Sequence, residues 1–267
     1  MDTKKIKTAF TGFASIAIPV LIVLAILLFI FVMGDPQNFQ GNNPENLPKP
    51  GNYLGTIYKG GIIVPILMSI LMMVFTFSIE RIITLSRAKG KGKVNVFVAK
   101  VHQKLFAQDI DSAISECDKQ RGSVASVIKA ALIKYKEMLT DKDKDKDQKI
   151  AAIKQEIEEA TSLEMPMLEQ NLVVLATIVP LATLMGLLGT VLGMIKAFSA
   201  LATAGAPDAI GLATGISEAL INTAFGISSS AFAMIFYNYF TNKIDKMTYS
   251  IDEFGVAIVQ NFASTQK

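Results

Sequence analysis

The chain has 267 residues, of which 51% are hydrophobic and 18% are charged, and its mean hydropathy is +0.41. Because an average soluble domain has roughly 25% charged residues, this composition argues against a soluble enzyme. The 26 Lys and Arg residues nearly balance the 23 Asp and Glu residues, and the net charge of +3 is too small for a nucleic-acid-binding protein. The single cysteine, Cys117, excludes an internal disulfide bond and a Cys-x-x-Cys redox pair.

Four stretches of the chain are long and apolar enough to cross a membrane, since a spanning helix needs about 20 apolar residues. The first occupies residues 1–34 and begins with three lysines, which resemble the start of a signal peptide. Its charge-free run from Thr8 to Gly34 is longer than the roughly 7 to 15 apolar residues of a signal peptide, so we expect an uncleaved helix. The other predicted spans are residues 60–79, 170–195 and 219–242.

Most of the charged residues lie between the second and third spans, in residues 80–169. Short loops rich in Lys and Arg stay in the cytoplasm, so we expect this segment and both termini, including residues 243–267, to be cytoplasmic. The outer connections are then residues 35–59, which are rich in Asn, Pro and Gly and are predicted to be irregular, and residues 196–218, which include the start of the fourth helix. This orientation leaves three lysines outside: Lys49, Lys59 and Lys196.

The cytoplasmic segment, residues 80–169, is predicted to be helical, because apolar residues recur in it at helical spacing. Asp109 or Asp111 can cap a short helix, and Ser123 can cap the next one. The run DKDKDKDQK at residues 141–149 is expected to be a solvated turn between two helices, although alternating charges could also contact a partner. An apolar helical stripe continues past the fourth span, so the last membrane helix is predicted to extend into the cytoplasm.

The spans do not carry the constellation of an enzyme. His102 is the single histidine, so a metal site with two histidines is excluded, and we expect His102 at an exposed helix position. Glycines in the third span lack the Lys-Ser/Thr sequence of a phosphate-binding loop and are instead predicted to let helices approach closely. The glycines given this packing role are Gly186, Gly189, Gly193, Gly211, Gly215 and Gly226.

Polar side chains are frequent in the last two spans. Thr183 and Thr190 lie seven residues apart and therefore share a helix face, and the same spacing relates Thr223 to Ser230. A hydroxyl in a membrane helix often bonds only to the carbonyl oxygen of its own helix, so a structural role is an equal alternative to a functional one.

Glu218 is harder to explain as a structural residue. It lies about 15 Å along the predicted fourth helix, and an acidic side chain near the membrane centre costs about 2.5 to 3.5 kcal/mol. We expect a role in an ion pathway or in gating. The structural alternative is a pair with Asn222, one turn away, or with Lys196 near the outer end of the third span.

The last two predicted spans contain runs that resemble the MotA/TolQ/ExbB proton-channel family, and within it the ExbB branch. These runs are LATIVPLATLMGLLGTVLGMIKAF (Leu175–Phe198) and GISEALINTAFGISSSAFAMIFYNYF (Gly215–Phe240). The family core has three spans with a large cytoplasmic domain between the first two, which correspond to the second, third and fourth spans here. We therefore expect an all-α integral membrane protein with four transmembrane helices and a helical cytoplasmic domain, and the resemblance implies a homopentameric ring.

The resemblance also implies a mechanism. The ring encloses an ExbD-like partner that has a single span with a membrane Asp, and the flow of H+ rotates the ring against this partner. A TonB-like protein carries the work to outer-membrane receptors, and no cofactor is implied. The N-terminal span, which the family core lacks, is expected to pack on the periphery of the ring.

Candidate ion-pathway residues follow from the same motifs. Thr190 in GLLGT and Thr223 in INTAFG resemble the pore-lining threonines of the family, and Glu218 in ISEAL resembles its membrane glutamate. The family commonly has Pro at the position of Thr183, while Pro180 lies one turn earlier here, so the choice between proton and sodium stays open. The neighbouring candidates are Thr183, Asn222 and Ser230.

The expected function is that of an ExbB-like subunit of the bacterial inner membrane that uses the proton motive force to energise TonB-dependent transport. A TolQ- or MotA-like stator subunit is the alternative within the family. From other classes, a non-conducting membrane scaffold and, more weakly, a solute transporter stay open. A scaffold would tolerate Glu218→Gln and Thr223→Val, whereas an ion-driven motor would stay assembled and stop working.

Overall fold

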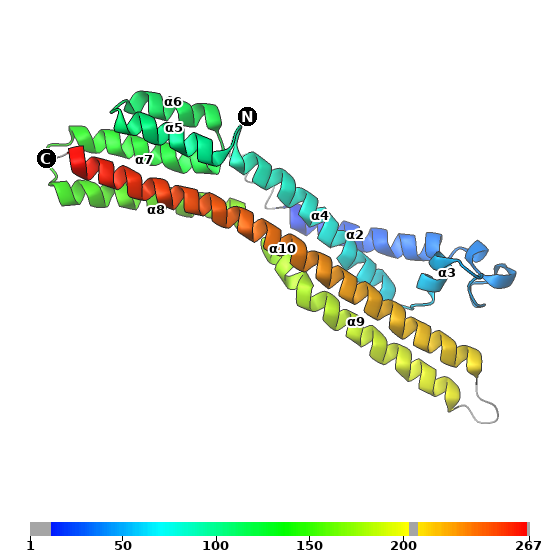
Figure 1. The fold of residues 1–267 in the computed structure, drawn as a ribbon. Helices are drawn as coiled ribbons and strands as arrows, with labels where there is room; N and C mark the ends of the chain where they lie inside the picture. The colour runs from blue at the N-terminus through cyan, green and yellow to red at the C-terminus, as the bar shows by residue number, and fades with distance from the viewer. Residues whose placement is uncertain (1–11, 203–207, 266–267) are drawn as a thin grey trace. The chain divides into compact units, whose positions relative to one another are not determined.

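The computed structural model describes residues 12–202 and 208–265, and within these ranges its regular structure is helical, apart from an isolated β-bridge between Phe39 and Pro48 (Figure 1). Four helices of the described ranges are long and apolar enough to span a membrane, which confirms the predicted all-α membrane class. The three lysines before the first span lie outside the described residues. The chain forms two compact units: the first runs to Ile79 and resumes with Val173–Asn238, and the second comprises Glu80–Leu172 and the residues from Tyr239 onward.

The first unit begins with helix α2 (Phe13–Leu27), which continues as a π-helix, η1 (Leu28–Met33). Large apolar side chains are exposed along both segments, as expected for a helix that contacts lipid. Ala25 of α2 packs against Val64 of α4 (Ile63–Lys89). The first span is therefore attached to the second.

The loop between the first two spans, predicted to be irregular at residues 35–59, contains short helical elements. The Nδ2 atom of Asn38 donates to the carbonyl oxygens of Val32 (2.8 Å) and Met33 (3.0 Å) at the end of η1. Its Oδ1 atom accepts from Asn52 (3.0 Å). The Asn-rich sequence organises this loop because amide side chains replace the backbone partners that a helix end lacks. The elements are η2 (Pro36–Asn38), η3 (Gln40–Asn42) and α3 (Tyr53–Tyr58).

Two antiparallel helices complete the first unit: α9 (Leu172–Leu201) and the part of α10 (Ala209–Thr265) that ends at Asn238. Pro180 lies inside α9 without ending the helix. A proline removes one backbone hydrogen bond, and packing of the apolar helix on its neighbour outweighs that loss. The continuation of α10 beyond residue 242, predicted from its apolar stripe, is present in the structure as part of the same helix.

The end of α4 from Glu80 onward, four further helices and the C-terminal part of α10 form the second unit. Its core includes Tyr135, whose hydroxyl donates to Asn261 Oδ1 (2.7 Å) and whose ring meets Phe262 edge to face. Arg81 is fully buried, pairs with Glu80 (2.6 Å), and is thereby compensated within the unit. The helices are α5 (Val94–Phe106), α6 (Ile110–Gln120), α7 (Ser123–Thr140) and α8 (Lys146–Glu169).

The helix caps of the second unit match the sequence in part. Asp109 caps α6, as predicted, by accepting from the backbone N–H of Ser112 (3.1 Å). The prediction that Ser123 caps α7 is wrong, because Gly122, with φ of 87°, occupies the cap position and Ser123 is already helical. The charged run at residues 141–149, predicted to be a turn, forms an exposed turn only up to Asp145. The side chain of Asp145 accepts from the backbone N–H of Gln148 (2.8 Å) and caps α8, which begins at the next residue.

Candidate functional site

The last two spans touch along a line of small residues. A Cβ atom on Gly186 would lie 3.1 Å from the Cα atom of Gly226, and one on Gly193 would lie 2.6 Å from the backbone nitrogen of Ala219. Glycine lets α9 and α10 approach more closely than a side chain would permit, and close approach stabilises helix pairs in lipid. The other glycines at this contact are Gly189, which faces Asn222, Gly215, which faces Ala197, and Gly211, which faces Ala200.

The contact line divides the α9–α10 pair into two sides. Successive side chains of a helix are rotated by about 100° around its axis. In an antiparallel pair, a residue that directly follows a contact residue therefore projects to the same side of the pair on either helix. The residues that directly precede contact residues project to the opposite side. We name these the threonine side and the glutamate side.

The threonine side carries Thr190 and Thr223, which directly follow the contact residues Gly189 and Asn222. Thr183, seven residues before Thr190, projects to the same side. Each of the three hydroxyls donates to a carbonyl oxygen of its own helix, at distances of 2.6 to 3.3 Å. Large apolar side chains around them are exposed, which shows that the described helices of this chain leave the threonine side uncovered. These side chains are Leu187, Val191, Leu220 and Ile227.

The glutamate side carries Glu218 and Lys196, which directly precede the contact residues Ala219 and Ala197. The Lys196 Nζ atom lies 2.8 Å from each carboxylate oxygen of Glu218. Glu218 is 3% exposed, while the Lys196 side chain is 58% exposed. A buried carboxylate needs such a partner, and the structure supplies the lysine that the sequence offered as one of two alternatives.

A glycine pair before α4 covers the glutamate side. Gly61 has φ of 77°, which favours glycine, and a Cβ atom there would lie 2.8 Å from the Cδ atom of Glu218. The carbonyl oxygen of Gly60 accepts from Asn222 Nδ2 (2.9 Å). The predicted site did not include Gly60 and Gly61, although glycines at the start of a span allow close backbone approach.

The two remaining candidates serve the contact itself. Ser230 donates to the carbonyl oxygen of Val179 on the opposite helix (2.8 Å). Asn222 is fully buried, and its Oδ1 atom has no hydrogen-bond partner in the described part of the chain. The structure therefore separates the candidates into three hydroxyls on the threonine side, one ion pair on the glutamate side, and Asn222 between the helices. Ser230 lies seven residues after Thr223 and shares its face, but it donates across the contact to α9.

The sequence profile of the MotA/TolQ/ExbB proton channel family matches residues 112–253, which is more than half of the chain. The chain belongs to this family. The matched region contains α9 and the spanning part of α10, with all candidate site residues, whereas α2, η1 and α4 precede it. As a member of the MotA/TolQ/ExbB family with four membrane-capable helices, it is a multi-pass membrane protein.

Individual relatives carry names from two branches of the MotA/TolQ/ExbB family. A Synechocystis sp. protein named ExbB-like 3 is 38% identical over 86 residues, which cover 32% of this chain and 41% of the relative. A Methanothermobacter thermautotrophicus protein named as an ExbB homolog is 27% identical over 199 residues, which cover 73% and 66%. TolQ of Haemophilus influenzae is 27% identical over 212 residues, which cover 76% and 92%. The chain spans less than two thirds of the length of the first two relatives.

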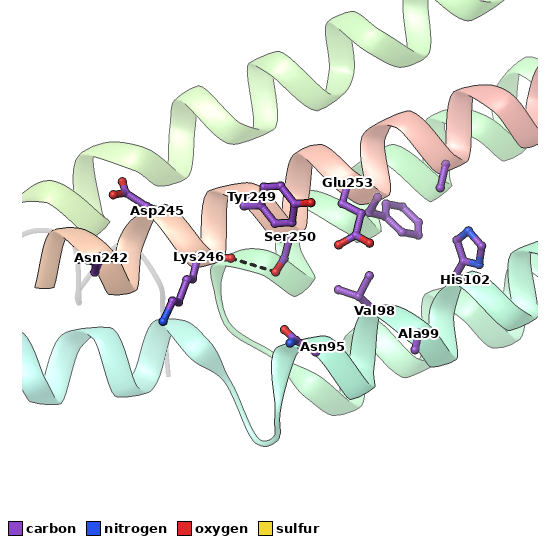
Figure 2. A pocket seen from close by; sticks show the side chains of 12 residues that line it. Asn95, Val98, Ala99, His102, Asn242, Asp245, Lys246, Tyr249, Ser250 and Glu253 are labelled. Carbon is purple, nitrogen blue, oxygen red and sulfur yellow. Dashed lines mark hydrogen bonds between the residues drawn. The ribbon is translucent and has the colours of Figure 1, made fainter. Parts of the chain in front are cut away.

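A groove of about 820 Å³ in the second unit lies between α5 and α10 (Figure 2). His102 of α5 and Tyr249 and Glu253 of α10 point toward it, and Ser250 donates to the carbonyl oxygen of Lys246 (3.0 Å). The prediction of an exposed position for His102 is wrong, because the ring is half-buried and packs 4.4 Å from Phe106, centroid to centroid. In the described ranges, no group of three or more His, Cys, Asp or Glu side chains could hold a metal ion.

Two neighbouring residues of α6 have shifted pKa values in opposite directions. Hydrogen bonds from Lys119 and Lys104 lower the pKa of Glu116 to about 2. Burial raises the pKa of the Cys117 thiol to about 12. A thiol that stays protonated at neutral pH is a poor nucleophile, so Cys117 is a core residue of this MotA/TolQ/ExbB family member.

Proposed function

We propose that the chain is an ExbB-like stator subunit that, with an ExbD-like partner, uses the proton motive force to energise TonB-dependent transport across the outer membrane. It lies in the bacterial inner membrane with both termini in the cytoplasm. The many Lys and Arg residues of residues 80–169 support this orientation. The family membership and the ExbB-like names of two relatives support the branch.

The observation that carries the proposal is the uncovered threonine side of the α9–α10 pair. Three hydroxyls lie there among exposed apolar residues, and an exposed apolar surface with a few polar groups marks an interaction site. In the proposed assembly, five copies turn this side toward a central pore. The pore encloses the single membrane helices of the partner.

The proposed mechanism uses the chemistry of a hydroxyl group. The hydroxyls of Thr190 and Thr223 donate to carbonyl oxygens of their own helices, which leaves the lone pairs of each oxygen free. A threonine hydroxyl can accept from a protonated carboxyl group or from water, and after rotating it can donate to a carboxylate. It can therefore accompany both states of a membrane Asp on the partner as H+ is taken up and released, and Thr183 adds a third hydroxyl to this row.

In this proposal Glu218 and Lys196 hold helices together and do not line the pore. They project to the side opposite Thr190 and Thr223, and Gly61 packs on the carboxylate. Their contribution to ion flow is then indirect, because they position the helices that carry the threonines.

A TolQ-like stator subunit is the second candidate, because the alignment with Haemophilus influenzae TolQ covers 92% of that relative. The two candidates share the ring, the single-span partner and the ion pathway. They differ in the protein that the complex acts upon. A MotA-like subunit and a non-conducting scaffold are the other candidates, and the experiment below tests them as well.

The test is co-expression of this chain with a single-span, Asp-containing protein from the same genome, followed by native mass spectrometry of the purified complex. Five copies of this chain with two of the partner are expected. Thr190→Val and Thr223→Val should then leave this mass unchanged and reduce proton flux in liposomes. A monomer or dimer without any partner would reject the stator and favour a scaffold. Complementation then separates the two branches: an ExbB-like subunit restores TonB-dependent uptake, and a TolQ-like subunit restores envelope constriction.

A further inference from the structure

A cluster of lysines surrounds a small cavity in the second unit. The cavity has a volume of about 250 Å³, and its walls also include the side chain of Glu116. The lysines come from the loop after α4, from α5 and from α6, so the fold brings together cations that are far apart in the sequence. We name this cavity the lysine pocket; its lysines are Lys91, Lys93, Lys100 and Lys119.

The loop that carries two of these lysines is fixed to α6. The backbone N–H of Lys91 donates to the carbonyl oxygen of Gln120 (2.8 Å), and the side chain of Gln120 donates to the carbonyl oxygen of Lys89 (3.0 Å). Gly90 has φ of 78° and a Cβ atom there would clash with the backbone of Gln120. The backbone under Lys91 and Lys93 is therefore held in place by bonds that do not involve their ammonium groups.

The one carboxylate in the wall of the lysine pocket is already occupied. Glu116 Oε1 accepts from Lys119 (2.8 Å) and from Lys104 (3.0 Å). For the other three lysines of the pocket, the described residues supply neither an ion pair nor a side-chain hydrogen bond. These three lysines are exposed, so water screens their repulsion in part, and a ligand with more than one negative charge would relieve the repulsion that is left.

We infer that the lysine pocket binds the phosphate group of an anionic ligand. Lysine is a common phosphate ligand, acting as a point charge with three donors. At about 30 Å³ per water molecule, the cavity holds about eight waters, which leaves room for one phosphate group. This inference does not depend on the proposed ion pathway.

The phosphate can come from a lipid headgroup or from a soluble compound. Lys91 lies twelve residues after Ile79, where the predicted span ends, and lysine clusters near the cytoplasmic side of a membrane attract anionic lipids. The chemistry of recognition is the same for both sources. The experiment therefore has one arm for each.

The first arm measures lipid. The full-length protein is purified in detergent with equal amounts of phosphatidylglycerol and phosphatidylcholine, and native mass spectrometry counts the lipids that stay bound. The second arm measures the thermal unfolding midpoint in inorganic phosphate and in chloride at equal ionic strength. Wild-type protein is expected to show at least one of two results. It retains at least about ten times more phosphatidylglycerol than phosphatidylcholine, or its unfolding midpoint is higher in phosphate than in chloride.

A triple variant, Lys91→Gln, Lys93→Gln and Lys100→Gln, should abolish this preference, because each lysine contributes about fivefold. Its matched control removes three lysines of the same unit that already form exposed ion pairs. That control should retain the ligand, because it changes net charge equally without altering the pocket. The control substitutions are Lys129→Gln, Lys134→Gln and Lys136→Gln.

Replacing the same three pocket lysines by Arg should restore binding, since the charge is kept. Because it keeps the positive charge, this variant also guards against a change of membrane orientation. Orientation is checked directly with Asp143→Cys, in the exposed turn before α8, by labelling from one side of the membrane. Retention of lipid alone assigns a headgroup, and a response to phosphate alone assigns a soluble phosphate compound. No preference in either arm, or an equal loss in the control variant, overturns the inference.

Discussion

Removing the Lys196 ammonium group while Glu218 stays in place tests whether the ion pair holds the helices together. Lys196→Ala leaves a carboxylate that is 3% exposed without either of its two 2.8 Å contacts. Breaking a fully buried pair costs about 3 to 5 kcal/mol, and breaking an exposed pair costs about 1 kcal/mol or less. Because the Lys196 side chain is 58% exposed, we expect a loss of about 1.5 to 3 kcal/mol, the range for hydrogen bonds to charged groups.

Glu218→Gln removes the charge of the other member of the pair, on α10. The glutamine keeps the volume of the side chain and an oxygen that can accept from Lys196, so we expect a loss of about 1 kcal/mol. In the Glu218→Gln background, Lys196→Ala no longer leaves a buried charge without a partner. The double variant should therefore be more stable than the sum of the two single losses predicts, with a coupling energy of about 1 to 2 kcal/mol.

The free energy of unfolding of wild-type protein, both single variants and the double variant is measured by SDS titration in mixed micelles. A coupling energy below about 0.5 kcal/mol would refute the structural role. Proton flux gives an independent check, because both single variants should lose flux in parallel with stability. If Glu218→Gln stops flux in a fully assembled complex while Lys196→Ala does not, Glu218 acts on the ion itself.

Further predictions concern individual residues of both units. Gly186→Leu should destabilise the α9–α10 contact by at least about 1 to 3 kcal/mol, seen as loss of the folded fraction in the same SDS titration. Thr190→Val and Thr223→Val should each leave this free energy within about 1 kcal/mol of wild type while lowering flux. Cys117, with a pKa of about 12, should resist maleimide at pH about 8 and react only after unfolding. The pKa of Glu116 is lowered from 4.5 to about 2, so its ionised form stabilises the folded state above pH about 4.5, and this stabilisation is lost as the pH falls toward 2. Glu116→Gln should therefore reduce the loss of thermal stability between these pH values.

The spans and the helical class were predictable because apolar runs and charge distribution act over many residues. The details at helix ends were less predictable. Asp109 caps α6 through a bond to a residue three positions away, which a local pattern can indicate. The cap position of α7 depends instead on Gly122, where a Cβ atom would lie 2.8 Å from the backbone nitrogen of Gly90, and that contact lies far away in the sequence.

The same limit applies to the site. Seven-residue spacing placed Thr183 and Thr190 on one face, and this face is uncovered in the structure. The spacing could not show which side of the helix pair Glu218 occupies, because that depends on which face of α10 meets α9. The contact face is set by glycine contacts such as Gly186 with Gly226, and the number of residues in the connection does not specify it.

The two sides of the α9–α10 pair explain how a further span can be added to a family core of three. Phe75 of α4 meets Phe232 of α10 (5.6 Å between ring centroids), and Phe225 of α10 packs against the cluster that contains Ala25 of α2 and Val64 of α4. By the helical rotation per residue, Phe225 and Phe232 project to the glutamate side. The first span therefore attaches through α4 to the side that is already covered. Its addition leaves the threonine side open, and the proposed pore needs that side to be open.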